Sequence, residues 1–224
     1  MVFVIAFILA IVAVYCFFKG KKVHRIHQLM VDTKTSKADA LSEGLCEVQG
    51  KIGSVDPPLV SPWTQQQCIY YDFKVQEQRT RKSGKTTTTY WADYVTDKNV
   101  QPFTVNDQTG SVEINSDAAE FKVRTDRRAR SGFLDDASSE LQSLLKGRYG
   151  TSTQGWVFNK TLRYSENVLA VGDEVYVFGE AKRVGDKLVI SNGAMPLIVT
   201  EEGERLAEEG YSKSATAYLV GLIL

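Results

Sequence analysis

The sequence predicts a mainly β protein, either a sandwich or a partly open barrel, with one or two amphipathic helices and an N-terminal transmembrane helix. Three observations lead to this fold class. The first 18 residues contain no charged side chain, most later segments alternate apolar and polar residues as strands require, and one stretch near residue 140 has helical spacing instead. The chain is 43% hydrophobic and its 27 Lys and Arg equal its 27 Asp and Glu, which excludes global disorder.

The apolar N-terminal segment, residues 1–18, is long enough to cross a bilayer. As a helix it spans roughly 27 Å, close to the ~30 Å hydrocarbon core. It has no basic region before it and ends in bulky aromatic residues, so we do not expect a cleaved signal peptide. Basic residues follow it directly, and such flanking charge tends to stay in the cytoplasm. We therefore expect a single-pass or double-pass membrane protein whose main domain is cytoplasmic.

Four further segments are expected after the apolar run. Residues 19–40 form a basic juxtamembrane linker that includes at most a short frayed helix, and 41–200 form the β-rich domain. A charged helix is expected at 201–214, followed by an uncharged apolar segment at 215–224. Ten residues make only about half a span. This last segment is therefore a partial second span, an interfacial tail or a tail packed on the domain.

The clearest strand pair is a long hairpin. Residues 69–76 alternate apolar and polar side chains, 86–96 have the composition to pair with them, and 82–85 supply the turn. The apolar face is formed by Ile69, Tyr71, Phe73 and Val75. Further strands are expected at 46–52, 102–105, 111–114, 121–124, 158–164, 174–178 and 188–191. Short strands at such spacing are typical of a sandwich or barrel.

One segment, 134–146, interrupts this pattern. Its apolar residues recur at spacings of three and four, acids stand in its first turn, and Lys146-Gly147 closes it. The apolar residues are Leu134, Ala137, Leu141, Leu144 and Leu145. The spacing predicts an amphipathic helix.

Residue types that carry catalysis are scarce. The chain has three Cys and two His, whereas a zinc site needs about four ligands at short spacing. Both histidines, His24 and His27, belong to the expected linker, which argues against histidine-dependent catalysis. Neither of the common glycine-rich phosphate-binding loops is present. We therefore predict no catalytic residue, no metal and no cofactor.

Two basic clusters form the candidate interaction surface, one at the expected hairpin tip and one after the expected strand 121–124. Their members are Arg79, Arg81, Lys82, Lys85, Arg127, Arg128 and Arg130. Beside exposed aromatic residues they could contact lipid headgroups or single-stranded nucleic acid, or they are solvated loops balanced by acids elsewhere. The zero net charge does not favour nucleic acid as a partner.

Five motifs follow one another after the apolar run. They are SEGLCEVQG (42–50), DPPLVSP (56–62), CIYY (68–71), FTVNDQTGSV (103–112) and the stretch 163–181, which contains GDEVYVFGEA (172–181). In this order they resemble the GIDE domain, also called the "beside a membrane" domain. This is the β-rich module of membrane-anchored mitochondrial RING ubiquitin ligases and of their RING-less prokaryotic relatives. The resemblance implies turn and close-packing roles for Gly44, Gly50, Pro57, Pro58, Gly110, Gly172 and Gly179.

In those ligases a second span and a RING follow the module, and a RING binds two zinc ions through eight Cys or His ligands. This chain has only five such residues. The resemblance therefore implies a membrane-anchored, non-catalytic protein-interaction or scaffold module, with the lipid bilayer and an unidentified membrane or cytoplasmic protein as partners. One alternative is a component or RING-less relative of a RING-type E3 ubiquitin transferase. The other is a β-barrel that binds lipid headgroups or single-stranded nucleic acid through its basic loops.

Overall fold

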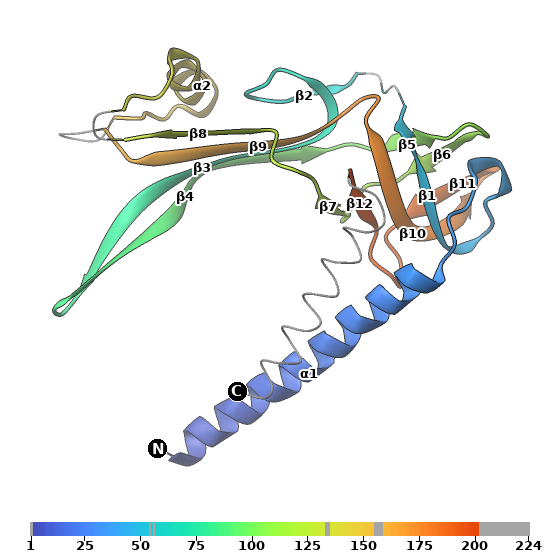
Figure 1. The fold of residues 1–224 in the computed structure, drawn as a ribbon, viewed down its shortest axis with the longest axis horizontal. Coiled ribbons are helices and arrows are strands. Elements are labelled where there is room, and N and C mark those ends of the chain that lie inside the picture. Colours follow the sequence, from blue (N-terminus) through green and yellow to red (C-terminus); the bar gives the residue numbers. More distant parts are fainter. Residues whose placement is uncertain (1, 54, 56, 133–134, 155–158, 202–224) are drawn as a thin grey trace. The chain divides into compact units, whose positions relative to one another are not determined.

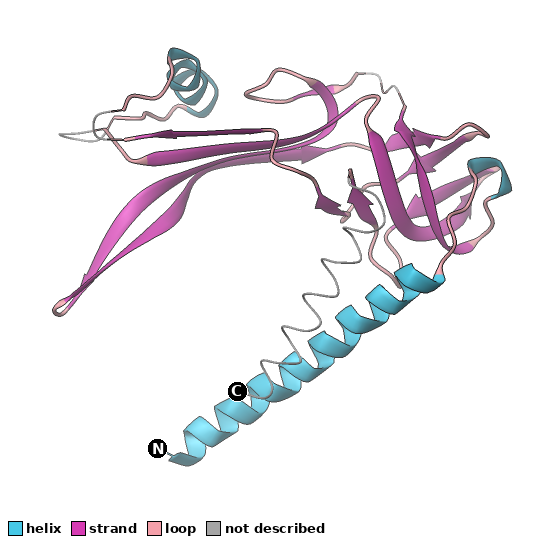
Figure 2. Ribbon diagram, viewed as in Figure 1, coloured by secondary structure: helices cyan, strands magenta, loops and turns pink. Residues whose placement is uncertain are grey.

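The computed structural model is built mainly of strands (Figures 1 and 2). It describes residues 2–53, 55, 57–132, 135–154 and 159–201. The chain forms two compact units from interleaved segments. The first unit comprises 1–52, 104–122 and 174–224, and the second comprises 53–103 and 123–173. The mainly β class with barrel-like sheets and two helices is confirmed, and α2 (Ser139–Tyr149) corresponds to the amphipathic helix expected at 134–146.

Helix α1 extends over Val2–Asp32, so residues 19–32 continue a helix where we expected a linker. The reason lies in the C-terminal part of α1, where Ile26 and Met30 are buried against Tyr176 and Phe178 of the first unit. Apolar residues three and four apart along this part form one helix face, a weak signal among the surrounding basic residues. Packing of that face stabilises the helix well beyond the apolar run.

No helix among the described residues is both long enough and apolar enough to cross a membrane. The transmembrane helix expected at residues 1–18 therefore stays a prediction.

The first unit contains a closed ring of five strands. In hydrogen-bonding order these are β1 (Gly44–Ile52), β5 (Phe103–Asn106), β6 (Ser111–Ile114), β11 (Lys187–Ser191) and β10 (Glu174–Val184). β1 also pairs with β10, which closes the ring, and β6 runs parallel to β11. In chain order the ring reads 1-2-3-5-4, the Greek-key order of OB-type barrels. β12 (Ile198–Thr200) pairs with β10, and β7 (Glu120–Lys122) pairs with β12.

Glycines of the family motifs allow close packing in this barrel, as expected. A Cβ added at Gly50 would lie 2.4 Å from the backbone oxygen of Asn106, and one at Gly179 would lie 2.8 Å from a side-chain carbon of Ile190. A short 3-10 helix, η1 (Ala38–Ala40), precedes β1. The Asp107 carboxylate accepts a hydrogen bond from the backbone N–H of Ala38 at 2.9 Å, which ties this segment to the β5–β6 turn.

The second unit is an antiparallel sheet covered on one face by helix α2 (Ser139–Tyr149). Its strands are β2 (Leu59–Val60), β3 (Gln67–Ser83), β9 (Leu162–Ala170) and β8 (Arg127–Ser131) in that order, with β4 (Thr86–Val100) paired to β3. The long hairpin is confirmed, since β3 and β4 pair up to Ser83 opposite Thr86. The core of this second unit contains Phe73, Val75, Leu141, Leu145, Leu162 and Tyr164.

Two elements of this unit differ from the expectation. β8 is a strand where we expected only a basic loop, because its pairing with β9 does not depend on an apolar pattern of its own. Helix α2 begins at Ser139, later than expected, because the Ser138 side chain caps it by accepting a hydrogen bond from the backbone N–H of Leu141. Leu134, Phe158 and the expected segments from 202 onward lie outside the described residues.

Candidate anion-binding site

The seven basic residues expected to form an interaction surface all lie in the second unit, but in three different surroundings. Arg79, Arg81, Lys82 and Lys85 are exposed near the tip of the β3–β4 hairpin. Of these, Arg79 pairs with Glu77, with its Nε 2.8 Å from a carboxylate oxygen. The structure thus confirms that the hairpin tip is basic.

Arg127, the first residue of β8, is held by groups on the face that carries α2. Its guanidinium donates two hydrogen bonds, of 3.2 and 3.1 Å, to the Glu140 carboxylate on α2. It also lies 4.4 Å from the centroid of the Trp63 ring. Arg127 therefore attaches the helix to the sheet. Because its guanidinium is engaged by both groups, it is the least able of the seven basic residues to bind a partner.

Arg128 and Arg130 of β8 line a cleft together with Arg163 of β9. The two β8 residues are two apart, so they share the sheet face opposite Arg127. The cleft has a volume of about 400 Å³, and Gln76, Thr125 and Ser165 complete its polar lining. No lining residue is Asp or Glu. The cleft is therefore a concentration of positive charge with hydrogen-bond donors.

The arginines of the cleft are oriented by neutral groups. The Nε of Arg163 donates to the side-chain oxygen of Gln76 at 2.6 Å, and its guanidinium stacks over the Trp91 ring at 4.4 Å. Arg128 donates to the Thr125 hydroxyl at 3.2 Å. Within the described ranges no carboxylate pairs with the three cleft arginines. By contrast, the four arginines at 79, 127, 148 and 183 each form an ion pair.

The strand register places two of these cations on neighbouring strands. Arg130 of β8 lies directly opposite Arg163 of β9. Like charges directly opposite one another destabilise a sheet, and an anion bound between them would reverse this effect. The arrangement can therefore bind an anionic group, since a guanidinium matches carboxylate and phosphate oxygens with two parallel hydrogen bonds.

Sequence reasoning identified Arg128 and Arg130 but missed Arg163, Gln76 and Ser165. Arg163 stands alone in the sequence, flanked by Leu162 and Tyr164. The alternation of apolar and polar residues through 162–165 is the signal that could have placed its side chain on an open sheet face.

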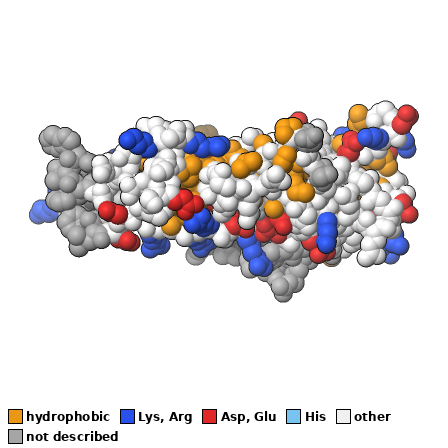
Figure 3. All heavy atoms as spheres, turned by 90° about the horizontal axis from the view of Figure 1, so that it is seen from above, with side chains coloured by type: hydrophobic (Ala, Val, Ile, Leu, Met, Phe, Trp, Pro, Cys, Tyr) orange, Lys and Arg blue, Asp and Glu red, His pale blue; other side chains and the backbone are white. Residues whose placement is uncertain are grey.

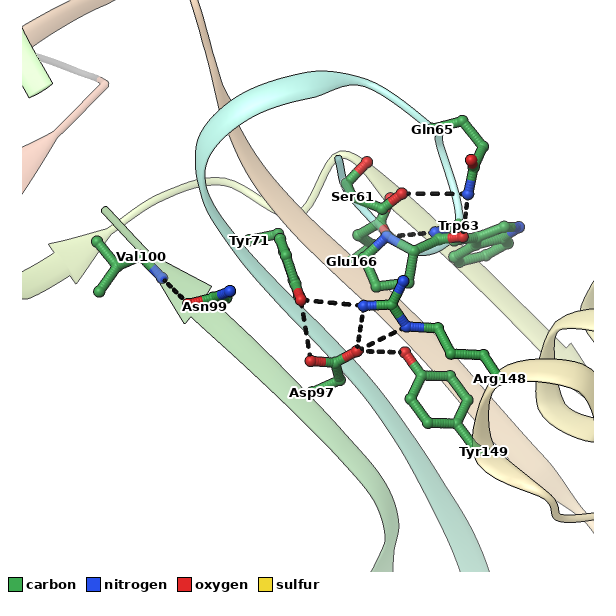
Figure 4. A network of polar contacts seen from close by, with 11 residues as sticks. Ser61, Trp63, Gln65, Tyr71, Asp97, Asn99, Val100, Arg148, Tyr149 and Glu166 are labelled. Atoms are coloured by element: carbon green, nitrogen blue, oxygen red, sulfur yellow. Dashed lines mark hydrogen bonds and ion pairs between the residues drawn. The ribbon is translucent and has the colours of Figure 1, made fainter. Parts of the chain in front are cut away.

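A buried carboxylate organises the loop that holds Trp63 against Arg127. The Glu166 side chain is fully buried and accepts hydrogen bonds from the backbone N–H groups of Trp63, at 2.7 Å, and Thr64, at 2.8 Å (Figure 4). The hydroxyl of Thr64 donates a third at 2.6 Å. Glu166 points to the helix-covered face and is therefore not part of the cleft lining.

The two buried thiols, Cys46 and Cys68, are poorly suited to nucleophilic or metal chemistry. Burial raises the pKa of Cys46 and of Cys68 to about 11, so both thiols stay protonated at neutral pH. Among the residues that the structure describes, no group of three or more His, Cys, Asp or Glu side chains is arranged to hold a metal ion.

Charge elsewhere on the surface is mixed. On the face drawn in Figure 3, blue Lys and Arg side chains alternate with red Asp and Glu side chains. This agrees with the zero net charge of the chain. The lining of the cleft, by contrast, contains no Asp or Glu.

Fold and site together define a mainly β protein with barrel-like sheets and an open, arginine-lined cleft. The family model named GIDE, described as "E3 Ubiquitin ligase", matches residues 74–224, about two thirds of the chain. The chain therefore belongs to the GIDE family, as the motifs indicated, and is a relative of E3 ubiquitin ligase domains. All the residues that line the cleft fall within the match. Neither a curated protein nor a solved structure matches the chain.

Proposed function

We propose that this chain is a membrane-anchored, non-catalytic protein-interaction module of the GIDE type. The observation that carries the proposal is the cleft, which three arginines line with no Cys, His, Asp or Glu in the lining. Such a site can hold an anionic group but offers neither a general base nor a thiol nucleophile. The segment boundaries expected from the sequence, with the main domain at 41–200, belong to this proposal.

Helix α1 supports the proposed anchor. Ahead of its docked part it exposes large apolar side chains, among them Phe7, Ile11 and Phe18, which are 67%, 54% and 66% accessible. Soluble surfaces rarely expose such contiguous apolar groups, whereas a bilayer accommodates them. The basic residues after position 18 favour a cytoplasmic main domain. GIDE proteins are in general membrane-associated, which agrees with this location.

The anchor is tested by deletion of residues 2–18 from the full chain. We expect the full chain to stay in the membrane pellet after alkaline extraction and the deletion variant to appear in the supernatant. Ile26 and Met30 remain in the variant, so its circular dichroism spectrum should keep the β signature. Release of the full chain by alkali would contradict the proposal.

The family description favours a second candidate, a component or RING-less relative of a RING-type E3 ubiquitin transferase. A reconstituted reaction with ubiquitin, activating enzyme and charged conjugating enzyme tests whether the chain transfers ubiquitin by itself. We expect no ubiquitin transfer above a reaction without this chain, because its five Cys and His cannot supply the eight ligands of a RING. Zinc-dependent transfer by the chain alone would exclude the non-catalytic reading.

A further inference from the structure

We propose that the arginine cleft binds an acidic peptide in extended conformation, which adds as a strand to the free edge of β8 with carboxylates on Arg128 and Arg130. This inference rests on the proposed interaction function and states the chemistry of the partner.

The first argument is the position of β8 in its sheet. β8 is the terminal strand of the order β2–β3–β9–β8, and among the described strands its partner is β9 alone. The free side of an edge strand presents unpaired backbone N–H and C=O groups. An extended peptide can pair with them, so that main-chain hydrogen bonds supply affinity and alternate side chains supply specificity.

The second argument is spacing. Arg128 and Arg130 project from one face of β8 about 7 Å apart, the distance covered by two residues of a strand. Carboxylates at alternate positions of an added strand have the same spacing. Directly opposite residues of neighbouring strands have Cβ atoms about 5 Å apart, within reach of a guanidinium–carboxylate pair.

The third argument is charge. Arg128 and Arg130 form no ion pair within the described ranges, and no Asp or Glu lines the cleft. Arg163 adds a third positive charge behind them, on β9. The cleft therefore attracts carboxylates to the edge of β8.

The same observations favour a peptide over the other anionic partners. The Trp91 ring carries the Arg163 guanidinium on one face, and the Tyr164 side chain is only 2% exposed, so the cleft offers little aromatic surface for base stacking. A lipid headgroup would use the cations but not the backbone groups at the strand edge. Only an extended polypeptide uses the edge of β8 and the alternate arginines together.

The test uses the full chain in detergent and a fluorescent ten-residue probe in which Glu and Thr alternate. A peptide of identical composition with its five Glu residues in one block serves as the control probe. We expect the alternating peptide to bind at least tenfold more tightly, measured by fluorescence anisotropy. N-methylation of its alternate backbone nitrogens on the paired side should weaken binding by a similar factor. Equal binding of both probes would overturn the inference.

Two double variants separate the cleft from general electrostatics. Arg128→Gln with Arg130→Gln should weaken binding of the alternating peptide at least tenfold and leaves the Arg163–Trp91 stack intact. Arg81→Gln with Lys85→Gln removes the same charge from the hairpin tip and should change affinity less than twofold. Equal losses in the cleft and tip variants would overturn the inference.

Competing ligands decide the class of partner. The competitors are a ten-nucleotide oligothymidylate and soluble glycerophosphoserine. If either binds more tightly than the alternating peptide and loses affinity in the cleft variants, the partner is nucleic acid or a lipid headgroup and the inference is overturned. If no acidic peptide binds while the full chain resists alkaline extraction and transfers no ubiquitin, the inference fails and the proposed function stands.

Discussion

Asp97 on β4 joins two strands to the end of helix α2 (Figure 4). Its carboxylate accepts hydrogen bonds from the Tyr71 hydroxyl at 3.1 Å, the Tyr149 hydroxyl at 2.7 Å and the Arg148 Nε at 3.1 Å. Burial and the adjacent Asp97 carboxylate raise the pKa of both tyrosines, so the hydroxyls stay protonated and donate. This network secures α2 on the sheet face opposite the cleft.

Substitution Asp97→Ala should therefore lower the free energy of unfolding by about 1–3 kcal/mol, because two tyrosine hydroxyls lose their acceptor. The ion pair adds little, since the Arg148 side chain is 44% exposed. Urea unfolding measures the change. Glu77→Gln, which breaks the exposed Arg79 pair, is the control and should change stability by less than about 0.5 kcal/mol. Equal effects of both substitutions would contradict the network's role.

At the level of single residues, the sequence indicated that arginines form the site but not which arginines line the cleft. Arg127, Arg128 and Arg130 form one cluster along the chain, yet strand alternation sends the first to the helix-covered face and the other two to the cleft. Arg163 joins them only through pairing of β8 with β9. No pattern within either segment records that pairing.

Among the elements, the β3–β4 hairpin shows how one strand pair divides into a packed base and a solvated tip. Phe73 and Val75 of β3 are buried in the core, and Tyr94 and Val95 of β4 pack against it. Beyond them the strands continue in register to Ser83 and Thr86, with exposed side chains on both faces over most of their length. The tip therefore contributes little to the core.

Replacement of residues 80–89 by Asn-Gly should leave the second unit folded. Arg79 and Tyr90 are register partners, so a two-residue turn can close the strands between them. We expect the free energy of unfolding, measured in urea, to change by less than about 1 kcal/mol, because no core residue is removed. Loss of the native circular dichroism spectrum would show that the tip is structurally required.

Local sequence signals predicted the boundaries of some elements better than those of others. The leucine spacing of α2 predicted the correct helix, whereas its start is set by the Ser138 cap and not by the acids before it. The strands expected at 111–114 and 188–191 agree closely with β6 and β11 because both alternate and end at turns.

For the whole molecule, the main feature is the interleaving of segments. Each unit is assembled from stretches separated by the other unit, and in the barrel Gly44 of β1 lies opposite Ala181 of β10. Pairing over such separations depends on the complete chain rather than on local propensity. Where two barrel strands approach closely, the addition of a single side-chain atom should therefore lower the stability of the fold.

Gly50→Ala tests this sensitivity. The new Cβ would lie 2.4 Å from the Asn106 backbone oxygen, so β1 and β5 must shift apart, and we expect a loss of about 1–3 kcal/mol by thermal unfolding. Gly147→Ala on α2 is the matched control. Its Cβ would meet no atom within 4 Å, and alanine favours a helix, so stability should rise slightly. A neutral Gly50→Ala variant would contradict the close approach.

The sequence by itself determined the mainly β class, the long hairpin, the GIDE family and the lack of enough Cys and His for a RING. These properties depend on local periodicity, motif order and residue counts, all of which are written along the chain. Only the tertiary structure decided the ring order of the barrel, the continuation of α1 past residue 18 and the grouping of Arg128, Arg130 and Arg163. The physical reason is that strand pairing joins distant residues, and a shift of one residue reverses the face on which a side chain lies.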